Sequence, residues 1–454
     1  RIDSRGPEVQ RILPRLNESI NEEWISDKAR FSYDGLKSQR IDRPFVRFEE
    51  KLVPASWDEA FAFIKSNIEN VKGNEIAAII GDLADCESIT ALKDFMTKLG
   101  SSNLECRQDG SQITGQSRAS YIFNSTIAGI DKADSILIVG SNPRHEAPVL
   151  NARIRKRFVS GNVNIGLIGE ERDLTYEYTY LGKGTKELKK LSNGKTNFFK
   201  ILKNSKYPML ILGQGALIGD DGLSVLGLAK KIADETKMIK PDQAWNGFNV
   251  LHTAAARVGA LDLGCFPKRK TNNIKTILQK AVKNEIKAVY LLGADEIDMN
   301  ALKNAFVIYQ GHNGDAGAQN ANVVLPGAAY TEKNATYVNT EGRAQRTKMA
   351  IFPPGESKED WTIIRALSEV LNKKLPYDTL EQVRERMGKI NKIFLKINMI
   401  NTEKWEPFGI TNSINDINFN NVIKNYYMTD TISRCSVTMA KCANEFGYLS
   451  SKKI

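Results

Sequence analysis

The sequence predicts an α/β fold with at least two layered sheets. Short apolar runs such as Ile76–Gly81 indicate strands that are buried on both faces of a parallel sheet. From about residue 55 to residue 372 these runs alternate with segments of helical periodicity, as expected for α/β layers. The chain has 454 residues, which is too long for one ordinary core and suggests two or three domains.

The first 50 residues are irregular and charged, and we expect short strands and turns there, such as Tyr33-Asp34-Gly35. A helix is then expected after Ser56, because Ser56 and Glu59 have the spacing of a capping box. The helix places its apolar residues on one face, and these are Ala60, Phe61, Ile64 and Ile68.

The alternation continues along the chain. Further strands are expected at Ser135–Val139, Val163–Ile168, Met209–Leu212, Ala288–Leu292, Phe306–Tyr309 and Val323–Leu325. Further helices are expected near Glu87–Lys98, Val149–Phe158, Asp221–Lys237, Trp361–Asn372 and Leu380–Met399. The pattern is long enough for two sheets, with breaks expected near Ile130–Asp134 and Pro267–Asn273.

Composition excludes some classes of protein. Hydrophobic residues make up 41% and charged residues 26%, as in ordinary globular proteins, and no apolar run approaches the ~20 residues of a membrane helix. We therefore expect contact with a membrane only through a partner. The net charge is +11, but the lysines are scattered, as in residues 186–200, and are not interleaved with aromatic residues in a stacking pattern. This pattern disfavours nucleic-acid binding.

The cysteines and histidines do not form a recognisable ligand set. No two cysteines have the C-x-x-C spacing of cluster or zinc sites, and no two histidines have helical ligand spacing. Few, unpaired cysteines fit a reducing compartment. We predict no catalytic, cofactor-binding or metal-binding residue. The cysteines and histidines to which this prediction applies are Cys86, Cys106, Cys265, Cys435, Cys442, His145, His252 and His312.

Glycine-rich segments leave two interpretations open. Gly213-Gln214-Gly215 with Gly219 follows a strand and could approach a dinucleotide, but Asp220 and Asp221 would repel phosphate, so a tight turn is favoured. The loop Gly311–Gly317 around His312 could line a cofactor pocket, and an empty strand-end loop is favoured. Gly194-Lys195-Thr196 lacks the first glycine of a P-loop. The pair Glu359-Asp360 is read as a solvated face or a helix start.

Longer motifs, spread over nearly the whole chain, resemble one family. They are Trp24–Phe31, Tyr33–Leu36, Arg40–Pro44, Ser56–Ala60, Cys106–Gly110, Ala133–Asp134, Gly140–Pro148, Val324–Gly327, Thr331–Arg343, Pro353–Glu356, Glu359–Trp361, Asn425–Asp430 and Ile432–Arg434. Together they look like the large iron–sulfur subunit of respiratory complex I, the proton-pumping NADH:ubiquinone oxidoreductase, in its mitochondrial and alphaproteobacterial form.

The resemblance implies a molybdopterin-oxidoreductase-like fold without cofactor. It would comprise a small, degenerate cluster-type domain at residues 1–54 and two Rossmann-like α/β domains. One of these would combine residues 55–130 with 275–375 around an inserted domain at residues 131–274, and an irregular extension would follow at residues 376–454. Iron–sulfur clusters are expected only in an N-terminal region outside this chain or on a separate polypeptide of the same subunit.

The implied role is structural. The chain would brace the cluster-bearing region that passes electrons from NADH and FMN toward ubiquinone, and its partners would be peripheral-arm subunits including the flavin subunit. The implied place is the matrix side of the mitochondrial inner membrane, or the cytoplasmic face of a bacterial plasma membrane. Two alternatives remain: an active molybdopterin oxidoreductase, and a nucleotide-binding regulatory protein that uses Gly213–Gly219.

Overall fold

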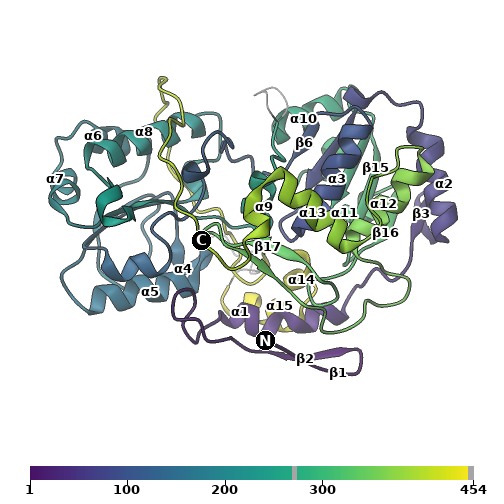
Figure 1. The fold of residues 1–454 in the computed structure, drawn as a ribbon, viewed down its shortest axis with the longest axis horizontal. Helices are drawn as coiled ribbons and strands as arrows, with labels where there is room; N and C mark the ends of the chain where they lie inside the picture. Colours follow the sequence, from purple (N-terminus) through teal and green to yellow (C-terminus); the bar gives the residue numbers. More distant parts are fainter. Residues whose placement is uncertain (268–272, 448–454) are drawn as a thin grey trace.

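The computed structural model describes residues 1–267 and 273–447 of the chain. Two large sheets dominate these residues, and helices pack on both faces of each sheet (Figure 1). The first residues and residues 431–445 lie near one another below the sheets. The predicted α/β class is therefore confirmed.

The first sheet has seven strands in the order β4-β3-β16-β15-β14-β5-β6. The five strands from β16 to β6 are parallel, whereas β3 and β4 form an antiparallel edge. The strands are β3 (Phe45–Phe48), β4 (Lys51–Pro54), β5 (Ile76–Ile80), β6 (Asn103–Glu105), β14 (Ala288–Leu292), β15 (Phe306–Gly311) and β16 (Val323–Pro326).

Alternate residues of this sheet enter two different cores. Ala78 and Ile80 pack with one set of helices, whereas Ala77 and Ile79 pack with the other set. This explains the continuous apolar runs of the sequence, because a strand covered on both faces needs apolar side chains at every position. The first set is α2 (Trp57–Ile68), α3 (Cys86–Lys98), α12 (Asp360–Val370) and α13 (Leu380–Ile390), and the second is α10 (Ile274–Val282) with η8 (Met299–Leu302) and α11 (Ala316–Asn320).

The second sheet has five parallel strands in the order β13-β10-β7-β8-β9. They are β7 (Ser135–Val139), β8 (Asn164–Ile168), β9 (Thr179–Gly182), β10 (Pro208–Leu212) and β13 (Phe248–Val250). Helix α5 (Pro148–Val159) packs on one face of this sheet. Helices α6 (Thr185–Ser192), α7 (Asn197–Asn204) and α8 (Gly222–Glu235) pack on the other.

The two ends of the chain form a smaller module. It contains β1 (Ile2–Arg5), β2 (Glu8–Ile12), α1 (Asp27–Phe31), η1 (Ser32–Lys37), α14 (Thr431–Arg434) and α15 (Val437–Glu445). A small core that includes Val9, Leu36 and Ile432 joins the first and last residues of this module. The C-terminal helices are thus packed against the N-terminal residues although more than 390 positions separate them in sequence.

Short elements connect these parts. Two further antiparallel pairs stand apart from the large sheets, and they are β11 (Ile239–Lys240) with β12 (Trp245–Asn246), and β17 (Thr336–Val338) with β18 (Ala344–Arg346). Further short helices are α4 (Pro143–Glu146), α9 (Arg257–Asp262), η2 (Gly73–Glu75), η3 (Arg118–Ser120), η4 (Ala128–Lys132), η5 (Gln214–Ala216), η6 (Pro241–Gln243) and η9 (Lys392–Leu395).

Some expected boundaries differ from the structure. The helix expected at Leu380–Met399 ends at Ile390, because Asn391 turns the chain and its side chain accepts a hydrogen bond from the Ile393 amide of the next short helix. Strands β3 and β4 were expected in the N-terminal module but extend the sheet beyond β16. Of the expected break at Pro267–Asn273, residues 268–272 lie outside the described residues.

Membrane contact through a helix was not expected from the sequence. Within residues 1–267 and 273–447, none of the helices combines the length and apolar character of a membrane span.

Candidate functional site

One cavity of about 570 Å³ is lined by loops from both large sheets. Each of these loops leaves the carboxyl end of a strand, which is where open α/β sheets bind their ligands. From the seven-stranded sheet come Asp82, Gln108, Asp109 and Glu296, which follow β5, β6 and β14. From the five-stranded sheet come Gly215, Ile218 and Thr253, which follow β10 and β13.

Residues 405–430, here named the closing segment, complete the wall of this cavity. Lining residues of the segment lie between Ile417 and Thr429. The Phe419 amide donates to the Lys183 carbonyl at 2.9 Å, and the Thr185 amide donates to the Ile417 carbonyl at 3.0 Å. The segment is therefore bonded to the five-stranded domain by backbone, and Figure 1 shows it as the yellow-green trace that crosses from α8 toward the C-terminal helices.

Glycines allow this close approach. A Cβ atom on Gly215 would overlap the Asn420 carbonyl, and one on Gly184 would overlap the Ile417 carbonyl. The turn Gly213-Gln214-Gly215, which could have approached a dinucleotide, leads into η5 and then α8. The backbone that approaches Gly215 is that of Asn420, in the closing segment.

The acidic wall of the cavity holds an incompletely partnered carboxylate. Among the described residues, Asp82 Oδ1 has no hydrogen-bond partner, and neither has Oε1 of the neighbouring Gln108. The amide Nε2 of Gln108 donates to Glu296 Oε2 at 2.7 Å. Burial, together with the negative charge of Glu296, raises the pKa of Asp82 to about 7.

The buried cation next to this wall is already engaged. Arg257 is 1% exposed, donates to the Ser111 hydroxyl at 2.9 Å and lies 3.1 Å from Asp109 Oδ2. Its Nε also donates to the Cys106 carbonyl at 3.2 Å. Because its N–H groups face these acceptors, Arg257 anchors the loop after β6 and leaves Asp82 without an ion pair among the described residues.

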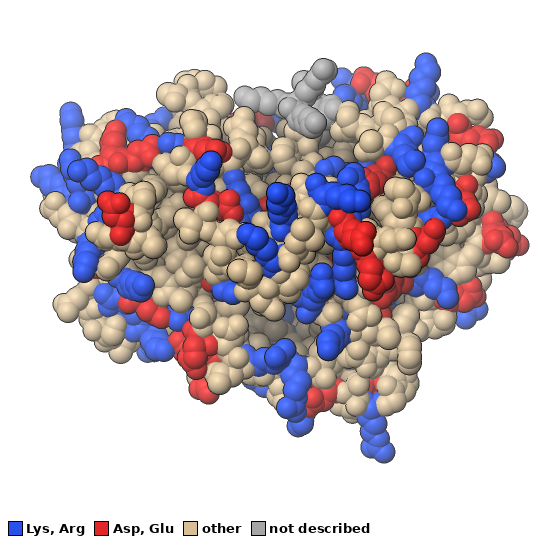
Figure 2. All heavy atoms as spheres, in the orientation of Figure 1, with Lys and Arg blue, Asp and Glu red and all other residues tan. Residues whose placement is uncertain are grey.

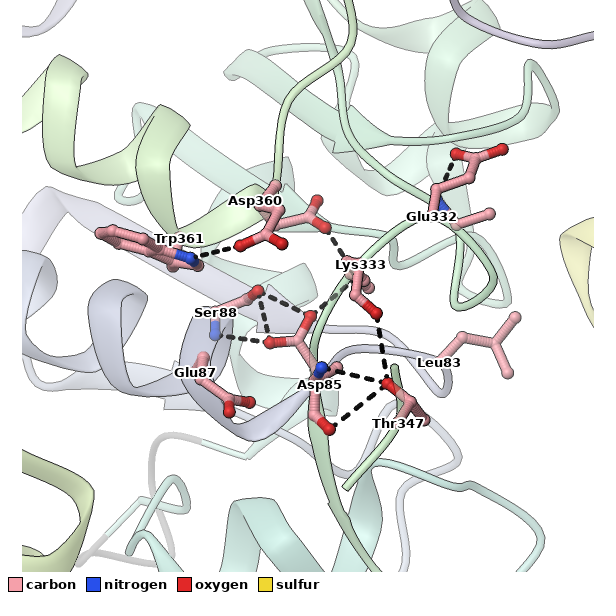
Figure 3. A network of polar contacts seen from close by, with 12 residues as sticks. Leu83, Asp85, Glu87, Ser88, Glu332, Lys333, Thr347, Asp360 and Trp361 are labelled. Carbon is pink, nitrogen blue, oxygen red and sulfur yellow. Dashed lines mark hydrogen bonds and ion pairs between the residues drawn. The ribbon is translucent and has the colours of Figure 1, made fainter. Parts of the chain in front are cut away.

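A second buried polar cluster joins the loop after β5 to Lys333 and Asp360 (Figure 3). The Lys333 ammonium lies 2.7 Å from Asp85 Oδ2 and 2.7 Å from Asp360 Oδ2. Asp85 caps helix α3 and accepts bonds from the Ser88 amide and hydroxyl. Burial opposes the charge on Lys333, but the two carboxylates outweigh it and raise the pKa of Lys333 well above its ordinary value.

The cluster continues through neighbouring residues of the same loop. Glu332 accepts two bonds from the Arg40 guanidinium, at 2.5 and 2.7 Å. Thr336 donates from its amide and its hydroxyl to Glu87, both at 2.7 Å. Residues 332–336 thus tie together residue 40, the first turn of α3 and the start of α12. We name the residues Lys333, Asp85 and Asp360 the lysine triad.

The structure brings together motifs that the sequence only placed in order. Arg40, Glu332, Lys333 and Asp360 come from three of the strings that carried the resemblance. Asp360 does start a helix, as one interpretation held, but it is 5% exposed, so the solvated-face interpretation is wrong. Sequence reasoning missed Asp82, Asp85 and Lys333, because single charged residues after a strand carry no local signal of burial.

The three histidines lie apart. Nε2 of His252 is 2.6 Å from the Tyr121 carbonyl, and burial lowers the pKa of His252 to about 4. His312 follows β15 in the glycine-rich loop, and its Nδ1 is 2.6 Å from Asn313 Oδ1. The ring of His145 packs against Tyr426 with centroids 5.5 Å apart. Each ring has a local packing or hydrogen-bonding role.

The cysteines are also separate. Cys86, Cys106, Cys265 and Cys435 are buried, and burial raises the pKa of the Cys265 thiol to about 12. In the part of the chain that the structure describes, no group of three or more His, Cys, Asp or Glu side chains has the geometry to hold a metal ion.

Comparison with known families now identifies the fold. The model of the family described as molybdopterin oxidoreductase matches residues 40–370. The chain belongs to this family. A family described as the C-terminal region of the G subunit of NADH-ubiquinone oxidoreductase matches residues 405–442, which include the closing segment.

Curated relatives are similar over nearly the whole chain. The 75 kDa subunit of NADH-ubiquinone oxidoreductase from Reclinomonas americana is 45% identical over 98% of this chain and 66% of its own length. The G subunit of NADH-quinone oxidoreductase from Rickettsia felis is 46% identical over 97% of this chain and 64% of its own. The mitochondrial 78 kDa subunit from Candida albicans is 45% identical over 98% and 62%. The resemblance to the large complex I subunit is therefore confirmed, and the chain spans slightly less than two thirds of these relatives.

Solved structures agree on the fold. Acetylene hydratase from Pelobacter acetylenicus superposes with a TM-score of 0.54 at 14% identity, over 79% of this chain and 65% of its own. The formyltransferase/hydrolase complex from Methylorubrum extorquens superposes with a TM-score of 0.52 at 15% identity, over 73% and 99%. The molybdopterin-oxidoreductase-like arrangement that the resemblance implied is confirmed.

One expectation about cofactors is wrong. Iron–sulfur modules were expected only outside this chain, but a family described as the NADH-ubiquinone oxidoreductase NDSU1/NuoG-like 4Fe-4S domain matches residues 1–34. The expectation came from the resemblance and from the lack of clustered cysteines, whereas the match extends over β1, β2, α1 and the start of η1. The first cysteine of the chain is Cys86, so thiolate ligands for a cluster at this module would come from outside residues 1–34.

The residues of the cavity do not fit a pterin cofactor. The Asn420 carbonyl lies over Gly215, where a phosphate-bearing ligand would approach the strand end. Asp82 and Glu296 line the remaining space, and carboxylates repel phosphate. Asp220 and Asp221 follow in the next turn. With the closing segment in place, a phosphate could not approach the strand end at Gly215, and the carboxylates would oppose its charge.

Proposed function

We propose that this chain is a structural part of the peripheral arm of proton-pumping NADH:ubiquinone oxidoreductase. The support is its 45–46% identity, over almost all of its length, to proteins named as subunits of NADH-ubiquinone or NADH-quinone oxidoreductase. The enzyme as a whole passes electrons from NADH and FMN toward ubiquinone, and the chain braces the region that carries the clusters.

A bracing role agrees with the way in which the site is built. The closing segment lies across the strand ends where a catalytic cofactor would bind. The lysine triad joins three segments through one buried ammonium that contacts two buried carboxylates. We propose that no residue of this chain is catalytic, and that the active molybdopterin oxidoreductase and the nucleotide-binding protein are the weaker alternatives.

We also propose a division into domains. A discontinuous α/β domain combines residues 55–130 with 275–375, and residues 131–274 form the inserted domain around the five-stranded sheet. The small N-terminal module ends before β3 rather than after residue 54, because β3 pairs with β16 and β4 pairs with β3. Residues 376–454 form the extension that contains the closing segment.

The proposed partners are other peripheral-arm subunits, including the flavin subunit and the cluster-bearing region. Exposed aromatic residues Trp24, Phe31 and Phe352 are suited to such contacts. Figure 2 shows Lys and Arg mixed with Asp and Glu over one face, without a continuous basic stripe of the kind that binds nucleic acid. The proposed place is the matrix side of the mitochondrial inner membrane or its bacterial equivalent.

A native gel of cell membranes, stained for NADH dehydrogenase activity and probed for this chain, tests the proposal. The chain should migrate with a large active particle. Lys333→Met should reduce the amount of particle but leave the NADH turnover of each assembled particle unchanged, and the exposed Lys287→Met should change neither. A chain that migrates alone, or a Lys333→Met particle that assembles normally and turns over slowly, would contradict the structural role.

A further inference from the structure

We propose that the cavity between the two sheets is a binding site for a small organic cation. The N–H donors of an amidinium, guanidinium or amine group would face Asp82 and Gln108, and an apolar body would lie against the closing segment. This inference does not depend on the proposed function, because it rests on the chemistry of the cavity wall alone.

The first observation is a pair of acceptors without donors. Gln108 is 7% exposed, and its Oε1 has no hydrogen-bond partner among the described residues. Its orientation is set by the Nε2 bond to Glu296, so Oε1 cannot exchange places with the amide nitrogen without breaking that bond. Asp82 Oδ1 is also without a partner in the described part of the chain. Both side chains line the cavity, and buried acceptors require a donor.

The second observation is an excess of negative charge. Five carboxylates gather at this end of the sheet, and they are Asp82, Asp109, Asp295, Glu296 and Asp315. The buried or half-buried cations that face them are Arg257 and Arg434, and the exposed Lys424 also lines the cavity from the closing segment.

Both arginines are committed to other carboxylates. Arg257 lies against Asp109 at 3.1 Å. Arg434 lies 2.9 Å from Glu296 and 2.5 Å from Asp315. Asp82 is therefore left without an ion pair in the described part of the chain, and a ligand that bears positive charge would complete the set.

The third observation is the apolar character of the opposite wall. Ile218 follows β10, and the closing segment contributes Ile417, Val422, Ile423 and Met428. A cavity of about 570 Å³ with a few polar groups at one end is typical of small-molecule sites. A metal ion would leave this apolar wall unused, and an anion would meet the carboxylates.

The protonation of Asp82 should make the affinity for a cation depend on pH. Asp82 is surrounded by Glu296, Asp109, Arg257 and Gln108, and burial with the charge of Glu296 raises its pKa to about 7. A cation that binds the carboxylate must displace this proton. We therefore expect binding to strengthen about tenfold between pH 6 and pH 8, as a single group of this pKa loses its proton.

Isothermal titration calorimetry of the native protein, isolated with any subunits that accompany it, tests the proposal with three isosteric probes. Benzamidine carries the cationic head on an apolar ring, benzamide is neutral and benzoate is an anion. Benzamidine should bind once per chain and at least about tenfold more tightly than benzamide, because a charge-assisted pair with a carboxylate is stronger than a neutral bond. Benzoate should not bind.

Variants locate the binding. Asp82→Asn and Glu296→Gln keep the shape of the wall, and each should weaken benzamidine about tenfold or more. Asp242→Asn, at an exposed position in η6, is the matched control and should bind as the unmodified protein does. Thermal unfolding without probe establishes that each variant is folded.

Three results would overturn the inference. One is the absence of heat with both benzamidine and the longer cation agmatine at millimolar concentration. Another is equal affinity for benzamidine and benzamide, which would indicate apolar contact only. The third is unchanged benzamidine binding in folded Asp82→Asn and Glu296→Gln, which would place the ligand elsewhere.

Discussion

Asp82 and Asp85 lie three residues apart in the loop after β5, yet their environments are opposite. Asp85 accepts the Lys333 ammonium and two bonds from Ser88, and these partners outweigh burial and lower its pKa. Asp82 has no ion pair among the described residues, since its neighbour Arg257 is bonded to Asp109, and burial raises its pKa to about 7. Asp85 is buried and Asp82 is only partly exposed, so both carboxylates are desolvated, and the partners decide whether such a carboxylate stabilises the fold or remains available to a ligand.

The largest expected effect comes from removing the ion pair of Asp85, so that Asp85, like Asp82, has no ion pair among the described residues. Lys333→Met removes the ammonium and leaves Asp85 and Asp360 buried without their cation. Breaking a buried pair in this way costs about 3–5 kcal/mol of unfolding free energy. Denaturant unfolding measures the loss.

The control for this change is Lys287→Met, which removes the exposed ion pair with Glu75. Its loss should be much smaller, because solvent screens exposed pairs. Equal losses in the two variants would mean that the lysine triad contributes no more than a surface pair.

A smaller loss of unfolding free energy is expected from a change at Gly215, where the closing segment packs beside the cavity that Asp82 lines. Gly215→Ala places a methyl group against the Asn420 carbonyl, and overpacking of this kind costs about 1–3 kcal/mol. Thermal unfolding and limited proteolysis within residues 410–425 measure it, and cleavage should become faster as the segment detaches. Gly314→Ala is the matched control, since the added atom would meet only the Gln39 carbonyl at 3.6 Å. Cleavage at the same rate in both variants would count against a packed closing segment.

The last effect concerns Asp82 itself and depends on pH. Its folded-state pKa lies above the unfolded value, so the stability that this group contributes is present below about pH 4 and is lost as the pH rises through about 7. Asp82→Asn should therefore gain at least about 1 kcal/mol over the unmodified protein between pH 4 and pH 8. Chemical unfolding at several pH values measures this difference, and Asp242→Asn should show none. A constant difference across that range would mean that Asp82 is not desolvated in the folded chain.

Much of the fold could be predicted from local pattern. Runs such as Ile76–Gly81 indicated buried strands, and Ser56 with Glu59 indicated the start of α2, where both capping bonds are present. Helix α13 ended earlier than expected because Asn391 turns the chain, an effect of one side chain that periodicity does not detect. The prediction about the iron–sulfur clusters was wrong for a different reason. It took the cluster-bearing region to lie outside the chain, from the resemblance and the lack of cysteines, whereas the family match lies in residues 1–34, where there is no cysteine.

The sequence by itself determined the α/β class, the buried strands and the family, because each depends on residues that are close together in the chain. Tertiary structure alone decided which charges are paired. Lys333 meets Asp85 across 248 positions, whereas Asp82, three residues away from Asp85, forms no ion pair among the described residues because its neighbour Arg257 is bonded to Asp109. Tertiary structure also placed the Asn420 carbonyl against Gly215. The turn that resembles a dinucleotide-binding turn therefore packs against backbone of the same chain. Pairing and occlusion depend on distances between remote segments, and these distances exist only once the sheets have formed.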